Sequence, residues 1–228
     1  LYLFENYHLA LDNKVLDEGV DYLLDPVSGS AKGTFKLIYI DQKNIADLIS
    51  KIAVANEATF KKEAVILNSE GVNDVDTLKL FNDLKYLLAK MCPVLWINNN
   101  KFTWSIGREE LDYPIIELKS FSFNEVNEIH LDISNVYYDS LTTHNVIGYK
   151  EDKKRKKYII VSAHYDHLGK MGEAIFPGAN DNASGSAMMM SLIDYFSVNK
   201  PKNNMVFIAF GAEEAGILGS KHYVENPL

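Results

Sequence analysis

Three short segments in the second half of the chain carry the residue types that bind metal ions or transfer protons. The first segment follows the apolar run 158–161, the second precedes a helical pattern, and the third follows the apolar run 205–210. Acidic and imidazole side chains that gather at strand ends suggest a metal site and not a packed core. The candidate residues are His164, Asp166, Asp181, Glu213 and Glu214.

Each candidate, taken alone, has an ordinary structural explanation. A histidine at a strand end is more often structural, and an aspartate such as Asp181 ahead of a helix suits an N-cap. The pair Glu213-Glu214 suits a solvated loop. Together they favour a metal site, because all three segments adjoin strands that should lie in one sheet. Adjacent glutamates at a strand end diverge in direction, so one can bind metal while the other faces a bound water.

Four strands are expected in this half of the chain. Apolar and polar residues alternate at 129–133, which is typical of a half-exposed strand. A second strand is expected at 145–149. The continuous apolar run 158–161 is typical of a central strand buried on both faces, and 205–210 has the same character.

The connections between these strands carry their own patterns. The basic run 150–157 indicates a solvated hairpin turn between two strands. A helix is expected from about Ser184, and its three consecutive methionines, 188–190, are interpreted as core residues against the sheet.

The first half alternates strands and helices and contains no convergent catalytic set. Amphipathic helices are expected at 45–52 and 75–91, with Pro93 ending the second. The isolated His8 and His130 are interpreted as surface or packing residues. Strands are expected at 34–40, 64–67, 94–97 and 114–116. Helix residues expected to face inward are Ile45, Leu48, Ile49, Ile52, Leu78, Phe81, Leu84, Leu88 and Met91.

The composition excludes several classes of protein. The chain has 228 residues, 47% of them hydrophobic, and a formal net charge of −8, so bulk electrostatics do not favour nucleic-acid binding. No apolar run approaches the roughly 20 residues that a membrane span needs. The single cysteine, Cys92, excludes an intrachain disulfide and is expected to be a buried, inert thiol.

The three segments resemble the motifs of peptidase family M28 (clan MH), zinc aminopeptidases with two co-catalytic metal ions. Three ordered motifs at family-like spacing are a much stronger signal than one alone. The segment 216–223 is also similar to the one that follows in that family. The motifs read Ala163-His164-Tyr165-Asp166, Gly178-Ala179-Asn180-Asp181-Asn182-Ala183-Ser184-Gly185 and Phe210-Gly211-Ala212-Glu213-Glu214.

The resemblance implies a role for each candidate. His164 would bind one zinc ion, Asp181 would bridge two zinc ions, and Glu214 would bind the second. Glu213 would be the general base, which takes a proton from the attacking water and passes it to the leaving amine. Asp166 would orient a ligand. The substrates would be peptides trimmed from their amino termini, and the Asp181–Asn182 peptide bond would be cis.

The resemblance also implies an α/β fold in two parts. Residues 125–228 would form the first portion of a mixed-sheet, three-layer α/β/α zinc-exopeptidase domain of the phosphorylase/hydrolase-like kind. Residues 1–124 are similar to the protease-associated (PA) domain found in many members, which is thought to influence substrate access. Export to the periplasm or the extracellular space is an expectation from the family.

The sequence departs from the family pattern after Glu214. The family's site takes two more ligands, an Asp and a His, well downstream, and His222 resembles a helix-face residue instead. We therefore expect this chain to be a fragment without a complete site, with zinc partial or absent. Two alternatives stay open: a non-catalytic binding protein like the transferrin-receptor relatives, or a carboxypeptidase or glutaminyl cyclase on the same scaffold.

Overall fold

The computed structural model describes residues 2–56, 58–97, 102–107, 109–119, 126–138 and 140–227. The chain divides into two compact units. The first comprises Leu1–Asp139 with Lys170–Ile175, and the second comprises Ser140–Gly169 with Phe176–Leu228. Among the described residues, no helix is both long enough and apolar enough to cross a membrane.

The first unit is built on one mixed sheet with the strand order β2-β1-β8-β4-β5-β6-β7-β3. The strands β4, β5, β6 and β7 run parallel, and the remaining neighbours are antiparallel. The strands are β1 (Tyr2–Leu11), β2 (Lys14–Val15), β3 (Tyr22–Leu24), β4 (Ala31–Ile40), β5 (Glu63–Asn68), β6 (Val94–Ile97), β7 (Ile115–Leu118) and β8 (Glu128–Tyr137).

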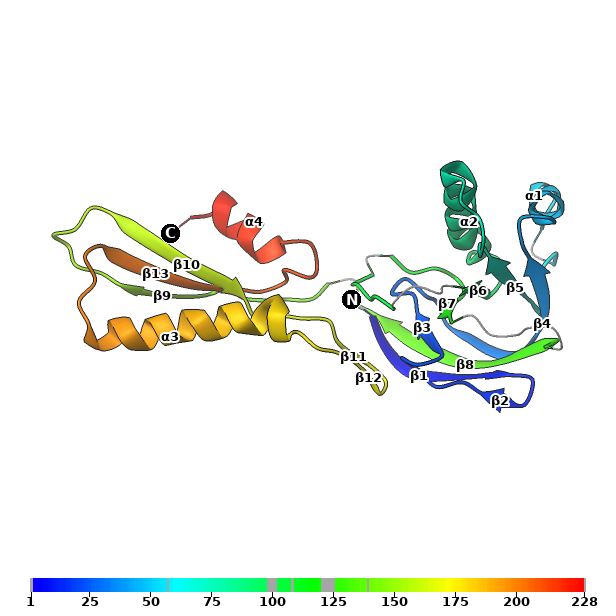
Figure 1. Ribbon diagram of the computed structural model, residues 1–228, viewed down its shortest axis with the longest axis horizontal. Coiled ribbons are helices and arrows are strands. Elements are labelled where there is room, and N and C mark those ends of the chain that lie inside the picture. The colour runs from blue at the N-terminus through cyan, green and yellow to red at the C-terminus, as the bar shows by residue number, and fades with distance from the viewer. Residues whose placement is uncertain are drawn as a thin grey trace. The chain divides into compact units, whose positions relative to one another are not determined.

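Two helices connect the parallel strands. The helices α1 (Ile45–Ala53) and α2 (Val75–Leu88) follow β4 and β5, because parallel neighbours need a crossover connection. Figure 1 shows both helices on the same side of the β4–β5–β6 part of the sheet. At the start of α2 the Asp74 carboxylate accepts a hydrogen bond from the Thr77 N–H at 2.8 Å, which is a standard N-cap.

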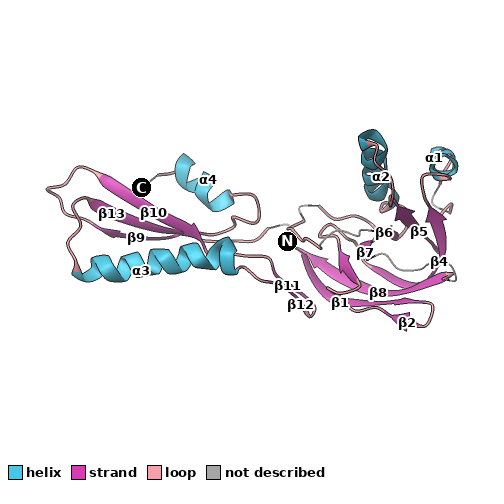
Figure 2. Ribbon diagram, viewed as in Figure 1, coloured by secondary structure: helices cyan, strands magenta, loops and turns pink. Residues whose placement is uncertain are grey.

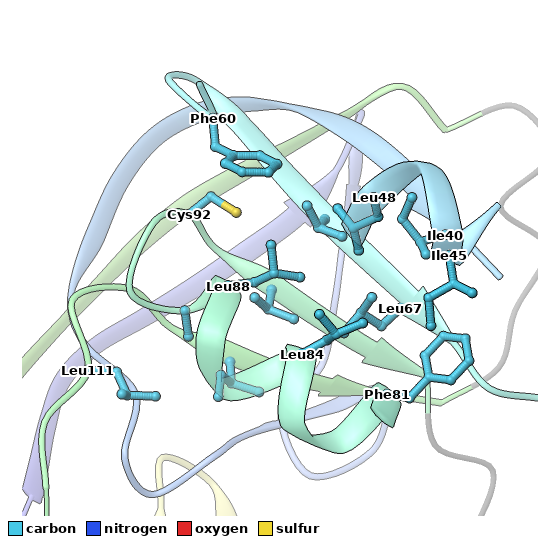
Figure 3. Close-up of a cluster of buried hydrophobic side chains, with 14 of the residues drawn as sticks. Ile40, Ile45, Leu48, Phe60, Leu67, Phe81, Leu84, Leu88, Cys92 and Leu111 are labelled. Carbon is cyan, nitrogen blue, oxygen red and sulfur yellow. The ribbon is translucent and has the colours of Figure 1, made fainter. Parts of the chain in front are cut away.

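The main core of this unit lies between those helices and the sheet (Figure 3). Ile45, Leu48, Phe81, Leu84 and Leu88 are buried there, as their spacing predicts. The prediction was wrong for Ile49 and Leu78, which are 40% and 37% exposed because they lie at the margin of the apolar stripe. Helix α2 also ends at Leu88, earlier than the predicted residue 91.

Cys92 belongs to this core and has no exposed surface. Burial disfavours the thiolate and, with the charge of Glu63, raises the pKa of the Cys92 thiol to about 12. The thiol is therefore protonated at neutral pH, as the prediction of an inert cysteine requires.

The predicted domain boundary at 124–125 falls within 120–125, outside the described residues. Strand β8, which was expected to open the second domain, instead pairs with β1 and β4 in the first sheet. Its alternation correctly placed Ile129, Leu131 and Ile133 on a buried face. Alternation indicates which face is buried but not which strands are the neighbours, so the sequence could not assign β8 to a sheet. The hairpin of β11 (Gly169–Met171) and β12 (Ala174–Phe176) also has most of its residues in the first unit.

The second unit contains a three-stranded mixed sheet in the order β10-β13-β9. The central strand β13 (Asn204–Phe210) runs parallel to β10 (Tyr158–His164) and antiparallel to β9 (Val146–Lys150). Helices α3 (Ser184–Val198) and α4 (Leu218–Glu225) lie on opposite sides of this sheet (Figure 2). This mixed sheet between helices agrees with the predicted α/β fold class.

Three predictions about this unit were wrong. Strand β10 was expected to be buried on both faces, but Tyr158, Ile159 and Ile160 are 45–54% exposed, since β10 is an edge strand with β13 as its partner. The basic run 150–157 is not a hairpin turn, because β13 lies between the two strands that it joins. Of the methionines 188–190, the middle one is buried and the others are more than 60% exposed, as the 3.6-residue period of a helix dictates.

Candidate metal centre

Four of the five candidate residues lie at or after the carboxyl ends of two parallel strands, His164 and Asp166 at β10 and Glu213 and Glu214 at β13, and the fifth, Asp181, lies before α3. His164 is the last residue of β10 and is paired in register with Phe210, the last residue of β13. The Tyr165 N–H donates to the Phe210 carbonyl at 3.0 Å and extends this pairing into the loop. The loop after β10 and the loop after β13 therefore begin side by side, where α/β sheets commonly place ligands.

The loop after β13, residues 211–217, is closed at its base by Asn145. The Gly211 N–H donates to Asn145 Oδ1 at 3.2 Å, and Asn145 Nδ2 donates to the Gly219 carbonyl at 2.8 Å. A Cβ at Gly219 would lie 2.2 Å from the Gly211 carbonyl oxygen, so this close approach requires glycine. Within the loop, Ala212 and Ile217 adopt left-handed backbone angles, with φ of 52° and 65°.

Asp166 joins the two loops. Its carboxylate oxygens accept hydrogen bonds from the backbone N–H groups of Glu213 and Glu214, both at 3.1 Å. Its backbone carbonyl lies 3.1 Å from His164 Nδ1, while its carboxylate is farther from that nitrogen, at 3.8 Å. These contacts suit the orienting role that the resemblance implies. The Asp166 carboxylate contacts the backbone of the two glutamates, whereas the Asp166 carbonyl contacts the His164 imidazole.

His164 is the most enclosed member of the site, with a side chain that is 10% exposed. Its Nε2 lies 2.9 Å from Asp181 Oδ1 and 4.0 Å from Glu213 Oε2. Burial disfavours the protonated imidazole, but hydrogen bonds to the Asp166 carbonyl and the Asp181 carboxylate, with the charge of Glu213, raise the pKa of His164.

Asp181 lies in the turn Ala179–Ala183, directly before α3. The Asp181–Asn182 peptide bond is cis, as the resemblance implies. Asp181 is not the helix cap, because α3 begins at Ser184 and the Gly185 N–H of its first turn donates to Asn182 Oδ1 at 3.0 Å. Its carboxylate is 72% exposed and contacts His164, so the aspartate is available to the site.

The described residues contain one group that could hold a metal ion, formed by His164, Glu213 and Glu214, with one ligand atom of each within 4.8 Å of the others. Imidazole nitrogen and carboxylate oxygen are donors that zinc accepts, so this set fits a zinc ion. The group includes Glu213, the predicted base, and leaves out Asp181, the predicted bridging ligand. The roles assigned to these residues remain predictions.

Sequence reasoning did not single out His167. Its Nδ1 lies 2.7 Å from Glu214 Oε1, and its side chain is 24% exposed. The sequence could have indicated His167 as a site residue, because it follows His164 by three residues in the same segment. The two isolated histidines are in the first unit, where His130 Nδ1 lies 2.8 Å from Thr34 Oγ1 and His8 lies on β1.

Sequence comparison finds a similarity to a known family over the segment that contains this site. Residues 145–228 match the model of Peptidase family M28. Aminopeptidase YwaD of Bacillus subtilis is 27% identical over 229 residues, which cover 95% of this chain and 46% of that protein. A probable zinc metalloprotease of Pyricularia oryzae is 43% identical over 74 residues, covering 31% of this chain and 15% of that protein.

Structure comparison agrees on the fold. The crystal structure of BSAP, a zinc aminopeptidase from Bacillus subtilis, matches with a TM-score of 0.60 at 20% identity, over 100% of this chain and 53% of that one. The chain thus spans about half the length of YwaD and BSAP. Residues 145–228 of this chain are thus similar to peptidase family M28, and the chain shares the fold of a solved zinc aminopeptidase.

Proposed function

We propose that the complete gene product is a zinc-dependent aminopeptidase that removes N-terminal residues from peptides. The observation that carries the proposal is the grouping of His164, Glu213 and Glu214 at the ends of two parallel strands, within the segment that matches family M28. The names of the relatives support the same activity, since YwaD is called an aminopeptidase and BSAP a zinc aminopeptidase.

Zinc would be held by His164, Asp181 and Glu214. When bound, a pair of zinc ions would supply Lewis-acid chemistry that activates water and stabilises charge on a peptide carbonyl oxygen. A site for two ions would also need the Asp and His ligands that the resemblance implies. The proposal therefore concerns the complete gene product and not the chain alone.

Glu213 is the proposed general base. Its side chain is 37% exposed, so the carboxylate is open to water, while its backbone N–H is fixed by Asp166 at 3.1 Å. A carboxylate in this position accepts a proton from the attacking water and returns it to the amine that leaves. Asp166 keeps Glu213 and Glu214 in place during both transfers, because it holds both backbone N–H groups.

The test is an assay of the complete gene product on aminoacyl-anilides and on blocked peptides, with zinc and with a chelator. We expect zinc-dependent hydrolysis of substrates that have a free amino terminus. Activity on blocked peptides alone would contradict the aminopeptidase and favour the carboxypeptidase alternative. No turnover on either substrate, with zinc bound, would favour a non-catalytic binding protein.

The substitution Glu213→Gln tests whether Glu213 acts as the general base or as a zinc ligand. General-base catalysis contributes about 10²- to 10⁴-fold, so kcat should fall by about that factor while the bound zinc, measured by mass spectrometry, stays unchanged. Glu225→Gln on α4 is the control, because Glu225 is exposed and lies outside the group. Loss of zinc from Glu213→Gln would instead make Glu213 a ligand.

The proposal extends to the first unit. We propose that the first unit acts as a PA-like domain that influences substrate access, which its β4-α1-β5-α2-β6 order supports. A structure of the complete gene product with a bound peptide should show peptide contacts to this unit, and their absence would contradict the role.

We also propose that the complete gene product is exported from the cytoplasm. Fractionating cells of the source organism and assaying each fraction tests this, and activity confined to the cytoplasmic fraction would contradict it.

A further inference from the structure

His167 is a titratable side chain at the candidate metal centre to which the proposed reaction assigns no part. It lies on the loop after β10, and its Nδ1 is 2.7 Å from Glu214 Oε1. Both side chains are largely enclosed, with 24% of His167 and 16% of Glu214 exposed. A short contact in an enclosed setting constrains the carboxylate more than an exposed ion pair would.

The backbone opposite His167 leaves room for its ring. A Cβ at Gly178 would lie 2.8 Å from both Cγ and Cδ2 of His167, closer than side chains approach one another. The φ of Gly178 is −92°, which any residue can adopt, so the conformation does not require glycine. The lack of space around Gly178 does require glycine, because a Cβ would also lie 2.9 Å from the Asp181 carbonyl oxygen. The imidazole is therefore seated between Gly178 and Glu214.

The contact determines which ring nitrogen carries hydrogen. An ionised carboxylate only accepts hydrogen bonds, so Nδ1 of His167 must be the donor to Glu214 Oε1. The Glu214 backbone N–H is held separately, by Asp166 Oδ2 at 3.1 Å. Neighbouring residues of one loop thus fix the backbone and the side chain of Glu214 independently.

We propose that His167 is a positioning residue for Glu214: it holds one carboxylate oxygen and thereby orients the carboxylate for zinc. This inference rests on the proposed function, because the orientation of Glu214 matters to activity only if Glu214 binds zinc. Residues that hydrogen-bond to metal ligands typically change metal affinity by about 10- to 100-fold when they are replaced.

The first test measures zinc affinity of the complete gene product by competition with a chromophoric chelator. We expect His167→Ala to weaken zinc binding by about 10- to 100-fold. His167→Asn should bind within a few-fold of the parent protein, because the asparagine Nδ2 can replace the imidazole Nδ1 as the donor. His222→Ala is the control, since His222 is exposed on α4. Equal zinc affinity of His167→Ala and the parent would overturn the proposal.

The second test does not depend on zinc binding. The ¹⁵N spectrum of histidine-labelled, zinc-free parent protein should show His167 protonated at Nδ1, with the signal assigned through His167→Asn. Protonation at Nε2 alone would overturn the proposal, because Nδ1 could not then donate to Glu214. If the parent itself binds no zinc, the proposed function fails; if the parent binds zinc and only the His167 variants behave unexpectedly, this inference alone fails.

Discussion

Replacing Asp166 by asparagine perturbs one side chain that organises the whole candidate metal centre. The carboxylate accepts two backbone hydrogen bonds, from Glu213 and Glu214, and its side chain is 24% exposed. Asparagine is nearly the same size and keeps one acceptor oxygen. Its NH₂ group, however, would face a backbone N–H, so one of the two bonds is lost and the other no longer has a charged acceptor.

The size of the effect follows from these two bonds. A hydrogen bond to a charged group contributes about 1.5–3 kcal/mol net, so the loss of one bond and the weakening of the other costs about 2 kcal/mol. In the proposed site, zinc binding requires the loop 211–217 in its ordered arrangement, so losing this free energy lowers the zinc affinity. At about 1.4 kcal/mol for each factor of ten, zinc should bind about 30-fold more weakly.

The measurement is a zinc titration of the complete gene product against a chromophoric chelator. Asp194→Asn is the matched control, because Asp194 is exposed on α3 and makes the same change in charge. Circular dichroism checks that both variants keep their secondary structure. A zinc affinity of Asp166→Asn within twofold of the control would refute the reasoning, since it would mean that the two backbone bonds do not hold the loop.

Three further substitutions test other parts of the structure. Asn145→Ala removes the acceptor of the Gly211 N–H and should lower the free energy of unfolding of the second unit by roughly 1–3 kcal/mol in urea titrations, with Asn145→Asp restoring part of it. Phe81→Ala should destabilise the first unit by about 3–5 kcal/mol, because Phe81 is fully buried, and an unchanged urea midpoint would contradict the described core. Hydrogen bonds from Thr77 hold the pKa of Asp74 below 3.8, so this cap stabilises α2 above that pH and is lost as the pH falls through the lowered pKa. In acid titrations followed by circular dichroism, Asp74→Asn should therefore show a smaller loss of stability than the parent.

The chemistry of the site could be predicted from local patterns. The polar segments that follow 158–161 and 205–210 could be assigned to strand ends, because a continuous apolar run that stops at polar residues marks where a strand leaves the interior. The helices α1 and α2 could be predicted because their apolar residues recur with the helical period. Both inferences depend on residues close together in the sequence.

Long-range pairing could not be predicted in the same way. The apolar run at β10 predicted burial, but burial depends on which elements cover the strand, and in this structure β10 is an edge strand. The basic run at 150–157 was interpreted as a hairpin turn because its flanking strands are adjacent in sequence. The insertion of β13 between them comes from residues about 50 positions away.

The sequence by itself determined which residue types form the candidate site and at which strand ends they lie, because those depend on local periodicity and on motif spacing. Only the tertiary structure showed that Asp166 holds the backbone of Glu213 and Glu214, and that His167 contacts the Glu214 side chain. These contacts join residues 47 or 48 positions apart. They form only when β10 and β13 pair in parallel, which no local pattern in either strand specifies.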